Sequence, residues 1–183
     1  MRGRVSTLLA GVVVIAALGA CGGGGSSGGA KLALGTEATI AYTVTASGST
    51  PAANTTLGVT VTKVRIGSQA DLSAAGLEPD DKNTTPYYID VHYTNKGNGS
   101  VEKNLDVGME DSDGNSIPTT LNFAFGADPF ALCDDSAKGS LAPGESYDSC
   151  SLLLVPNGKT PDRVRFVSQG PDNKITFTDW AVK

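Results

Sequence analysis

The sequence is poor in the side chains that most often carry out catalysis. Its 183 residues include a single histidine, His92, and only three cysteines. A hydrolase that removes a proton near neutral pH usually relies on histidine, so one position alone could supply such a base. The surrounding pattern places His92 on the polar face of a strand beside Asp90, as an ordinary surface residue. We therefore expect no catalytic residue, and a protein that is not an enzyme.

Basic residues are also in the minority. The chain has 19 acidic and 14 basic residues, a net charge of −5. Without the first twenty residues, which hold two arginines and no acid, 12 basic residues face 19 acidic ones and the charge is −7. A protein that binds nucleic acid or anionic lipid through its charge has the opposite sign of charge, and the interleaving of aromatic and basic residues that binds single strands is absent from the sequence. We expect no nucleic-acid partner.

The sequence has one marked apolar run, and it is shorter than a membrane span. Leu8 to Leu18 follows a short basic stretch containing Arg2 and Arg4, which is the order of a secretory signal peptide. A helix that crosses a bilayer needs about 20 apolar residues. We predict that residues 1–20 are a signal peptide.

A cysteine and a run of small residues follow this segment. Leu18-Gly-Ala-Cys21 resembles the bacterial lipobox, in which the cysteine receives diacylglycerol, and 22–29 is all glycine and serine and predicts a flexible tether. A lipidated cysteine carries at least two acyl chains, which hold a protein stably on a bilayer. We predict lipidation at Cys21, a tether over 21–33, and a position on the outer face of the bacterial cytoplasmic membrane. The alternative is an ordinary signal peptide that releases a soluble protein.

The other two cysteines form an even pair. An exported protein lies in an oxidising compartment, where a disulfide between Cys133 and Cys150 is the default expectation. These two cysteines are 17 positions apart. In the chain-entropy model, a disulfide that closes a loop of this length stabilises the folded state by about 3 kcal/mol. The alternative is a metal or redox pair, but neither cysteine belongs to a Cys-x-x-Cys motif and no histidine is near. We predict the disulfide.

From Leu34 onward no stretch keeps the 3.6-residue apolar period of a helix for long. Apolar and polar residues alternate instead over Ala38–Thr45 and Tyr87–Thr94, and turn residues recur about every ten positions. The alternation changes parity at Lys63, which predicts a β-bulge. Residues 69–85 read as a long loop with at most one helical turn. The pattern predicts an all-β antiparallel sandwich formed by one domain over residues 34–183.

Several further segments are expected to form strands and turns of this domain. We predict an Asp-Gly hairpin, a turn of type II, and a strand buried on both faces. The last strands should close the domain around Trp180. The segments are the inward faces Leu57/Val59/Val61, Leu105/Val107/Met109 and Leu121/Phe123/Phe125, the hairpin Asp111–Asn115, the turn Leu141–Glu145, the buried run Cys150–Val155, and the strands Val164–Val167 and Ile175–Val182.

The order of these segments resembles the immunoglobulin-like domains of unknown function found in lipoproteins of Gram-positive bacteria. The likeness covers most of residues 34–183. It implies a surface-anchored immunoglobulin-like sandwich and supplies no catalytic residues, and the predicted disulfide is a departure from many similar domains. The residues that carry it are Gly35–Glu37, Tyr88–Gly97, Asp111–Gly114, Leu141–Gly144 and Leu152–Pro156.

Acidic clusters offer candidate metal sites, and each has a simpler interpretation. Asp111, Asp113 and Asn115 alternate as in an EF-hand, but Ser116 and Asn122 stand where that loop needs glycine and glutamate. Asp80–Asp81 and Asp134–Asp135 are expected to be solvated loop charges. Glu110 and Asp111 are neighbours on a strand and point to opposite faces, so they do not converge as glycosidase carboxylates must. We predict no metal and no cofactor.

These observations favour a cell-surface lipoprotein whose immunoglobulin-like domain binds another envelope component, either a protein or a polymer. The alternative is a small-ligand or metal-binding accessory module of an envelope transporter or sensor, with the long loops as its site. A concave pocket lined by aromatic residues would favour the alternative, and a flat exposed apolar patch would favour a macromolecular partner. The sequence makes no prediction of the oligomeric state.

Overall fold

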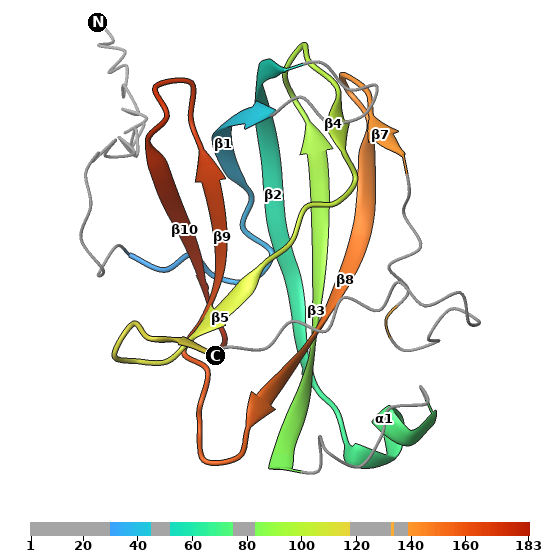
Figure 1. The fold of residues 1–183 in the computed structure, drawn as a ribbon, viewed down its shortest axis with the longest axis vertical. Helices are drawn as coiled ribbons and strands as arrows, with labels where there is room; N and C mark the ends of the chain where they lie inside the picture. Colours follow the sequence, from blue (N-terminus) through green and yellow to red (C-terminus); the bar gives the residue numbers. More distant parts are fainter. Residues whose placement is uncertain (1–29, 45–51, 75–82, 118–132, 134–138) are drawn as a thin grey trace, which may run out of the picture.

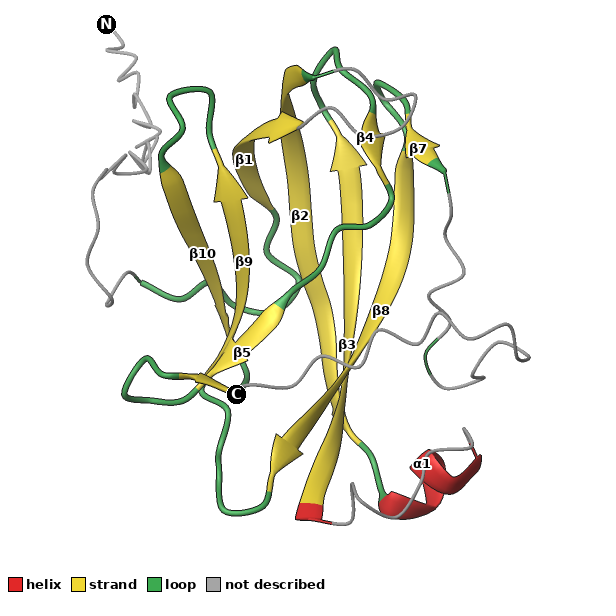
Figure 2. Cartoon of the chain, in the orientation of Figure 1, coloured by secondary structure: helices red, strands yellow, loops and turns green. Residues whose placement is uncertain are grey.

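The computed structural model describes residues 30–44, 52–74, 83–117, 133 and 139–183 (Figure 1). These residues form antiparallel sheets and one short helix, α1 (Gln69–Ala74), at one end of the strands (Figure 2). The expectation of an all-β protein with antiparallel sheets is confirmed. In the described ranges, no helix is long and apolar enough to cross a membrane.

The strands are arranged in two sheets of four and one pair. The first sheet has the order β1 (Ala38–Val44), β2 (Ala53–Ile66), β3 (Thr84–Asn95) and β8 (Ser146–Pro156). The second has the order β10 (Ile175–Ala181), β9 (Arg163–Gln169), β5 (Gly108–Glu110) and β6 (Ser116–Ile117). The pair is β4 (Val101–Glu102) with β7 (Ser140–Leu141).

The alternation along β3 decides which side of the first sheet becomes the core. Ile89, Val91 and Tyr93 are buried in the main core cluster, whereas Asp90 and His92 between them are only half-buried. Successive side chains of a strand point to opposite faces, so one side of β3 is apolar and the other polar. The predicted alternation is confirmed.

The parity change in β2 comes from a bulge. Val61 pairs with Val91, but the next pairs are Lys63 with Asp90 and Val64 with Ile89, so Thr62 is the extra residue. A bulge inserts one residue and returns the following side chains to the correct faces. The predicted bulge at Lys63 is confirmed, and it lets Val64 pack against the core.

The two four-stranded sheets face one another across the main core cluster. Phe166 of β9 lies 6.4 Å from Tyr42 and 6.1 Å from Tyr93, measured between ring centroids, so aromatic rings of both sheets meet there. Trp180 of β10 is fully buried in the same cluster, and its indole Nε1 donates a hydrogen bond to the carbonyl of Thr36 over 2.8 Å. Burying side chains of this size contributes about 1.5–3 kcal/mol each.

β8 is buried on both faces, as its continuous apolar run predicts. Leu153 and Val155 belong to the main core, while Leu152 and Leu154 belong to a second, smaller cluster on the opposite side of the sheet. Leu72 of α1 packs in this second cluster. The helix therefore covers one end of the outer face of the first sheet.

Two predicted turns are present. Asp111 and Asn115 close the hairpin between β5 and β6, where Gly114 has a φ of 81°. The amide of Glu145 donates to the carbonyl of Ala142 over 3.0 Å, and Gly144 has a φ of 82°. Glycine suits both positions because a positive φ costs it little.

The described chain begins against the second sheet. Leu32 forms a parallel bridge with Trp180, and Lys31 Nζ lies 2.6 Å from the carboxylate of Asp162. This ion pair lowers the pKa of Asp162 below its usual value. Residues 31–33, which the sequence assigned to the tether, thus lie against the folded unit.

Several predicted features lie outside the described residues. They are the signal peptide, the lipidation site Cys21, the two aspartate pairs at 80–81 and 134–135, and the expected inward face of Leu121, Phe123 and Phe125. The returning strand of the hairpin is described only as β6.

Cys133 and Cys150 are joined by a disulfide, with their Cα atoms 5.2 Å apart. Cys150 is buried in the second cluster beside Leu152, and Cys133 packs against the same cluster. The bond therefore attaches a residue outside the named strands to the outer face of the first sheet.

We expect that replacing Cys133 and Cys150 together with serine lowers the free energy of unfolding by about 2–5 kcal/mol, because the cross-link restricts the unfolded chain. Urea unfolding of the two forms measures the difference. Thiol titration of the denatured, unreduced mature protein should find neither cysteine free. Full reaction of both thiols would contradict the pairing.

Candidate functional site

The outer side of the first sheet carries a cluster of polar side chains, which we call the polar face. Its members come from β2, β3 and β8, at the positions that alternate with core residues. They are Arg65, Asp90, His92, Thr94, Ser146 and Asp148.

Arg65 and Asp90 form a two-pronged ion pair on this face. The guanidinium Nε and Nη2 donate to the two carboxylate oxygens over 3.0 and 2.7 Å. These hydrogen bonds raise the pKa of Arg65, and the guanidinium also lies 5.2 Å from the centre of the Tyr88 ring. Burial raises the pKa of the Tyr88 hydroxyl. The two hydrogen bonds with Asp90 therefore fix the position of the Arg65 guanidinium beside the Tyr88 ring.

His92 has a partner that the sequence did not indicate. Its Nδ1 lies 2.7 Å from Asp148 Oδ1, because the two residues are direct cross-strand neighbours on β3 and β8. The Thr94 hydroxyl lies 3.4 Å from His92 Nε2 and 2.8 Å from the Ser146 hydroxyl. The histidine side chain is 39% exposed and the aspartate 87% exposed. The sequence-based placement of His92 on the polar side of its strand is thus correct, and its partner on that side is Asp148.

A carboxylate, an imidazole and a hydroxyl follow one another here as in a hydrolase triad, from Asp148 to His92 to Thr94. Their surroundings differ from those of a triad. Acyl transfer also needs hydrogen-bond donors aimed at the developing oxyanion. His92 and Thr94 lie on an interior strand, whose amide groups pair with β2 on one side and β8 on the other. The amides of this strand are thus engaged in the sheet.

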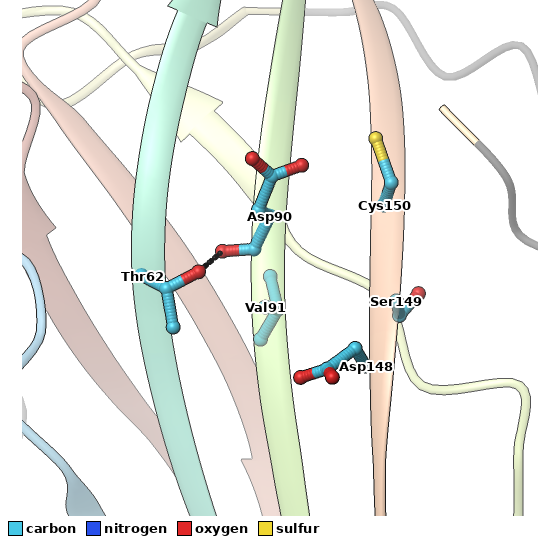
Figure 3. A pocket seen from close by; sticks show the side chains of 6 residues that line it. All are labelled: Thr62, Asp90, Val91, Asp148, Ser149 and Cys150. Atoms are coloured by element: carbon cyan, nitrogen blue, oxygen red, sulfur yellow. Dashed lines mark hydrogen bonds between the residues drawn. The ribbon is translucent and has the colours of Figure 1, made fainter. Parts of the chain in front are cut away.

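A shallow hollow of about 200 Å³ lies next to these residues, lined by Thr62, Asp90, Val91, Asp148, Ser149 and Cys150 (Figure 3). The Thr62 hydroxyl, on the bulge of β2, donates to the carbonyl of Asp90 over 3.0 Å. Ligand pockets usually span about 300–1,000 Å³ and have apolar and aromatic linings. This hollow is smaller, and the described residues that line it include no aromatic side chain.

The outer side of the second sheet holds a network of buried ion pairs. Arg165 donates to both carboxylate oxygens of Asp179 over 2.7 and 2.8 Å, and it also contacts Glu110. Arg163 Nη1 reaches Asp179 over 3.5 Å. The hydrogen bonds with Asp179 raise the pKa of Arg165. Among the described residues, Glu110 Oε2 and Arg163 Nε have no hydrogen-bond partner.

Three exposed apolar side chains lie beside this network on the same face, and we call them the apolar patch. Val167, Ile175 and Phe177 are 53%, 58% and 56% exposed. Val167 and Phe177 are direct partners across β9 and β10, and Ile175 is two positions from Phe177. The Phe177 ring lies 4.7 Å from the guanidinium carbon of Arg165.

Sequence reasoning found the strands of this second face but not its chemistry. Arg163 and Arg165 share parity in β9, and Asp179 has the matching parity in β10. This matching parity can be read from the sequence alone. It identifies an ion-pair network only once the register that joins Arg165 to Asp179 is known.

The Asp111 carboxylate holds the turn of the hairpin through hydrogen bonds. Its Oδ1 accepts hydrogen bonds from the amides of Asp113 and Asn115 over 3.0 and 2.9 Å. The bond from the Asn115 amide is the main cause that lowers the pKa of Asp111. Within the described ranges, no group of three or more histidine, cysteine or acidic residues could hold a metal ion.

Neither a protein-family model nor a curated protein matches the chain. Among solved structures, the chain is similar to the crystal structure of a conserved hypothetical protein from Bacillus anthracis. The two share 14% sequence identity with a TM-score of 0.43, and the match covers 79% of this chain and 97% of that one.

We expect the Asp111 carboxylate to stabilise the fold only while it is ionised. Because folding lowers its pKa, this contribution is complete above the ordinary value of 3.8 and is lost as the pH falls through the lower folded-state value. Asp111→Asn should therefore lower the melting temperature near pH 7 and change it little near pH 2. Asp113→Asn is the matched control, and an equal loss in both variants at pH 7 would contradict the role of Asp111.

We expect His92→Ala to change stability by no more than about 0.5 kcal/mol, because surface substitutions and exposed ion pairs contribute little. Chemical denaturation measures this change. Loss of ligand binding or of an enzymatic activity, with folding intact, would instead identify His92 as a functional residue.

Proposed function

We propose that this protein is a lipid-anchored component of the bacterial cell envelope, with a non-enzymatic immunoglobulin-like sandwich that binds another envelope component, a protein or a polymer. The observation that carries the proposal is the contact that the first described residues make with the second sheet. Leu32 is held by Trp180, directly after the glycine and serine run that follows Cys21. A lipid on Cys21 would thus be joined by a short chain to a domain that folds independently of the anchor.

The arrangement of the strands supports the immunoglobulin-like part of the proposal. Immunoglobulin-like domains pack two antiparallel sheets over one core, with inward and outward residues alternating along each strand. The two four-stranded sheets of this chain share one cluster, in which Trp180, Tyr93 and Phe166 are all buried.

The surfaces of the domain favour an interaction module over a small-ligand module. The hollow beside Asp90 is small, and none of the described residues that line it is aromatic. The polar face offers charged and hydroxyl groups that a protein or a polymer could contact. These are the features by which the two candidate functions differ.

The anchor is tested by Cys21→Ala in the native host. We expect the wild-type mature chain to begin at Cys21 and to fractionate with membranes, because acyl chains on this residue would hold it there. The variant should accumulate as unprocessed precursor or appear in the medium. Intact mass spectrometry of the wild type is the direct measurement, and an unmodified N-terminus at another residue would overturn the proposal.

A further inference from the structure

We propose that the apolar patch of Val167, Ile175 and Phe177 lies on the surface of the lipid bilayer that holds the anchor, so that the domain has a defined orientation on the membrane. This inference rests on the proposed lipidation of Cys21. It identifies the bilayer as a second contact of the folded domain itself.

The patch is unusual among the described surfaces. Four large apolar residues of the described ranges are mostly exposed, and three of them form this patch. The fourth, Ile66, stands by itself at the end of β2 in the other sheet. Contiguous exposed apolar groups on one face commonly mark a contact site.

The first described residues pair with the strand that carries two of the three patch residues. The Leu32 amide donates to the carbonyl of Asp179 over 2.8 Å, and the Ala181 amide donates to the carbonyl of Leu32 over 2.9 Å. The bridge to Trp180 is parallel, so the chain before Leu32 points the same way as β10 does before Trp180. Phe177 and Ile175 precede Trp180 in β10, and the described chain begins at one side of this strand (Figure 1).

The tether is short enough to keep the patch near the lipid. Ten residue steps separate Cys21 from Lys31, a distance of about 17 Å on average and about 35 Å at full extension. Phe177 and Ile175 are three and five positions from Trp180, or about 10 and 17 Å along a strand. The patch thus lies within the distance that the tether allows between the domain and the bilayer.

Tethering also means that a weak affinity of the patch for lipid is sufficient. A domain on a short flexible linker experiences an effective concentration in the millimolar range. Amphipathic surfaces bind the bilayer interface in proportion to the apolar area that they bury. A patch of three side chains can therefore orient a tethered domain even when it would not hold a free one.

Charge and size favour lipid over a second protein as the occupant. The positive charge of Arg165, which lies next to the patch, is paired with Asp179 and Glu110. Three apolar side chains are also far fewer than the roughly 20–30 residues that each partner contributes to a stable protein interface. Contact with lipid would leave the polar face, on the opposite sheet, directed away from the membrane.

The test attaches the domain to lipid chemically. The mature chain from Cys21 onward is coupled through the Cys21 thiol to maleimide lipids in phosphatidylcholine vesicles, since Cys133 and Cys150 are joined to each other. Phe177→Trp places a fluorescent reporter in the patch, and Ile66→Trp is the matched control at an exposed apolar residue of the other sheet. Trp180 is fully buried and gives the same background in both. Phosphatidylcholine with brominated acyl chains quenches a tryptophan that enters the bilayer interface.

We expect at least twofold stronger quenching of the Phe177→Trp reporter than of the Ile66→Trp reporter, and a reduction of that quenching when Ile175→Asp is added. Equal quenching of both reporters, or none, would overturn the proposal. A dimer of the uncoupled protein with a blue-shifted Phe177→Trp emission would assign the patch to a second copy instead. Because the coupling is chemical, these outcomes do not depend on lipidation in the cell, which the Cys21→Ala experiment tests separately.

Discussion

The pairing of β3 with β2 on one side and β8 on the other is the constraint on which the rest of the structure depends. Its register with β8 runs from Thr84 to Thr94 without a shift, and its register with β2 contains one bulge. This pairing fixes Ile89 and Val91 on the core side. It also aligns His92 with Asp148 on the polar face. Core and polar face are thus two results of the same backbone pairing.

The bulge at Thr62 shows how a local irregularity serves both faces. If β2 kept a regular alternation through Thr62, without a bulge, Val64 would point outward and Arg65 would point into the core, because a shift of one position exchanges the faces of a strand. With it, Val64 packs against the core and Arg65 reaches Asp90 on the outer side. The hollow beside Asp90 has Thr62 in its lining, so it depends on the same irregularity.

In the second sheet the polar residues of the outer face form largely buried ion pairs, whereas His92 and Asp148 on the polar face are exposed. On its outer face, Asp179 and Glu110 surround the Arg165 guanidinium, and these three side chains are largely buried. Removing one member of such a group would leave a buried charge without its partner, which is far more costly than losing an exposed pair. The network therefore keeps β5, β9 and β10 in register. Their pairing in turn holds Phe177 and Val167 at the surface beside it.

Much of the fold could be predicted from local patterns. The alternation in β3, the bulge near Lys63, the hairpin at Asp111 and the double burial of the run ending at Val155 all follow from neighbouring residues. These features depend on a side-chain period of two or on the turn chemistry of a few adjacent positions.

The contacts that define the candidate surfaces could not be predicted in this way. Arg165 meets Glu110 across 55 positions, His92 meets Asp148 across 56, and Leu32 meets Trp180 near the other end of the chain. Each depends on which distant strands become neighbours and in what register. By itself, the sequence determined the strand positions and the faces that become buried, because the alternation that encodes them is local. Only the tertiary structure decided which charges and apolar groups meet at the surface, because those pairs form when segments far apart in the chain are brought side by side.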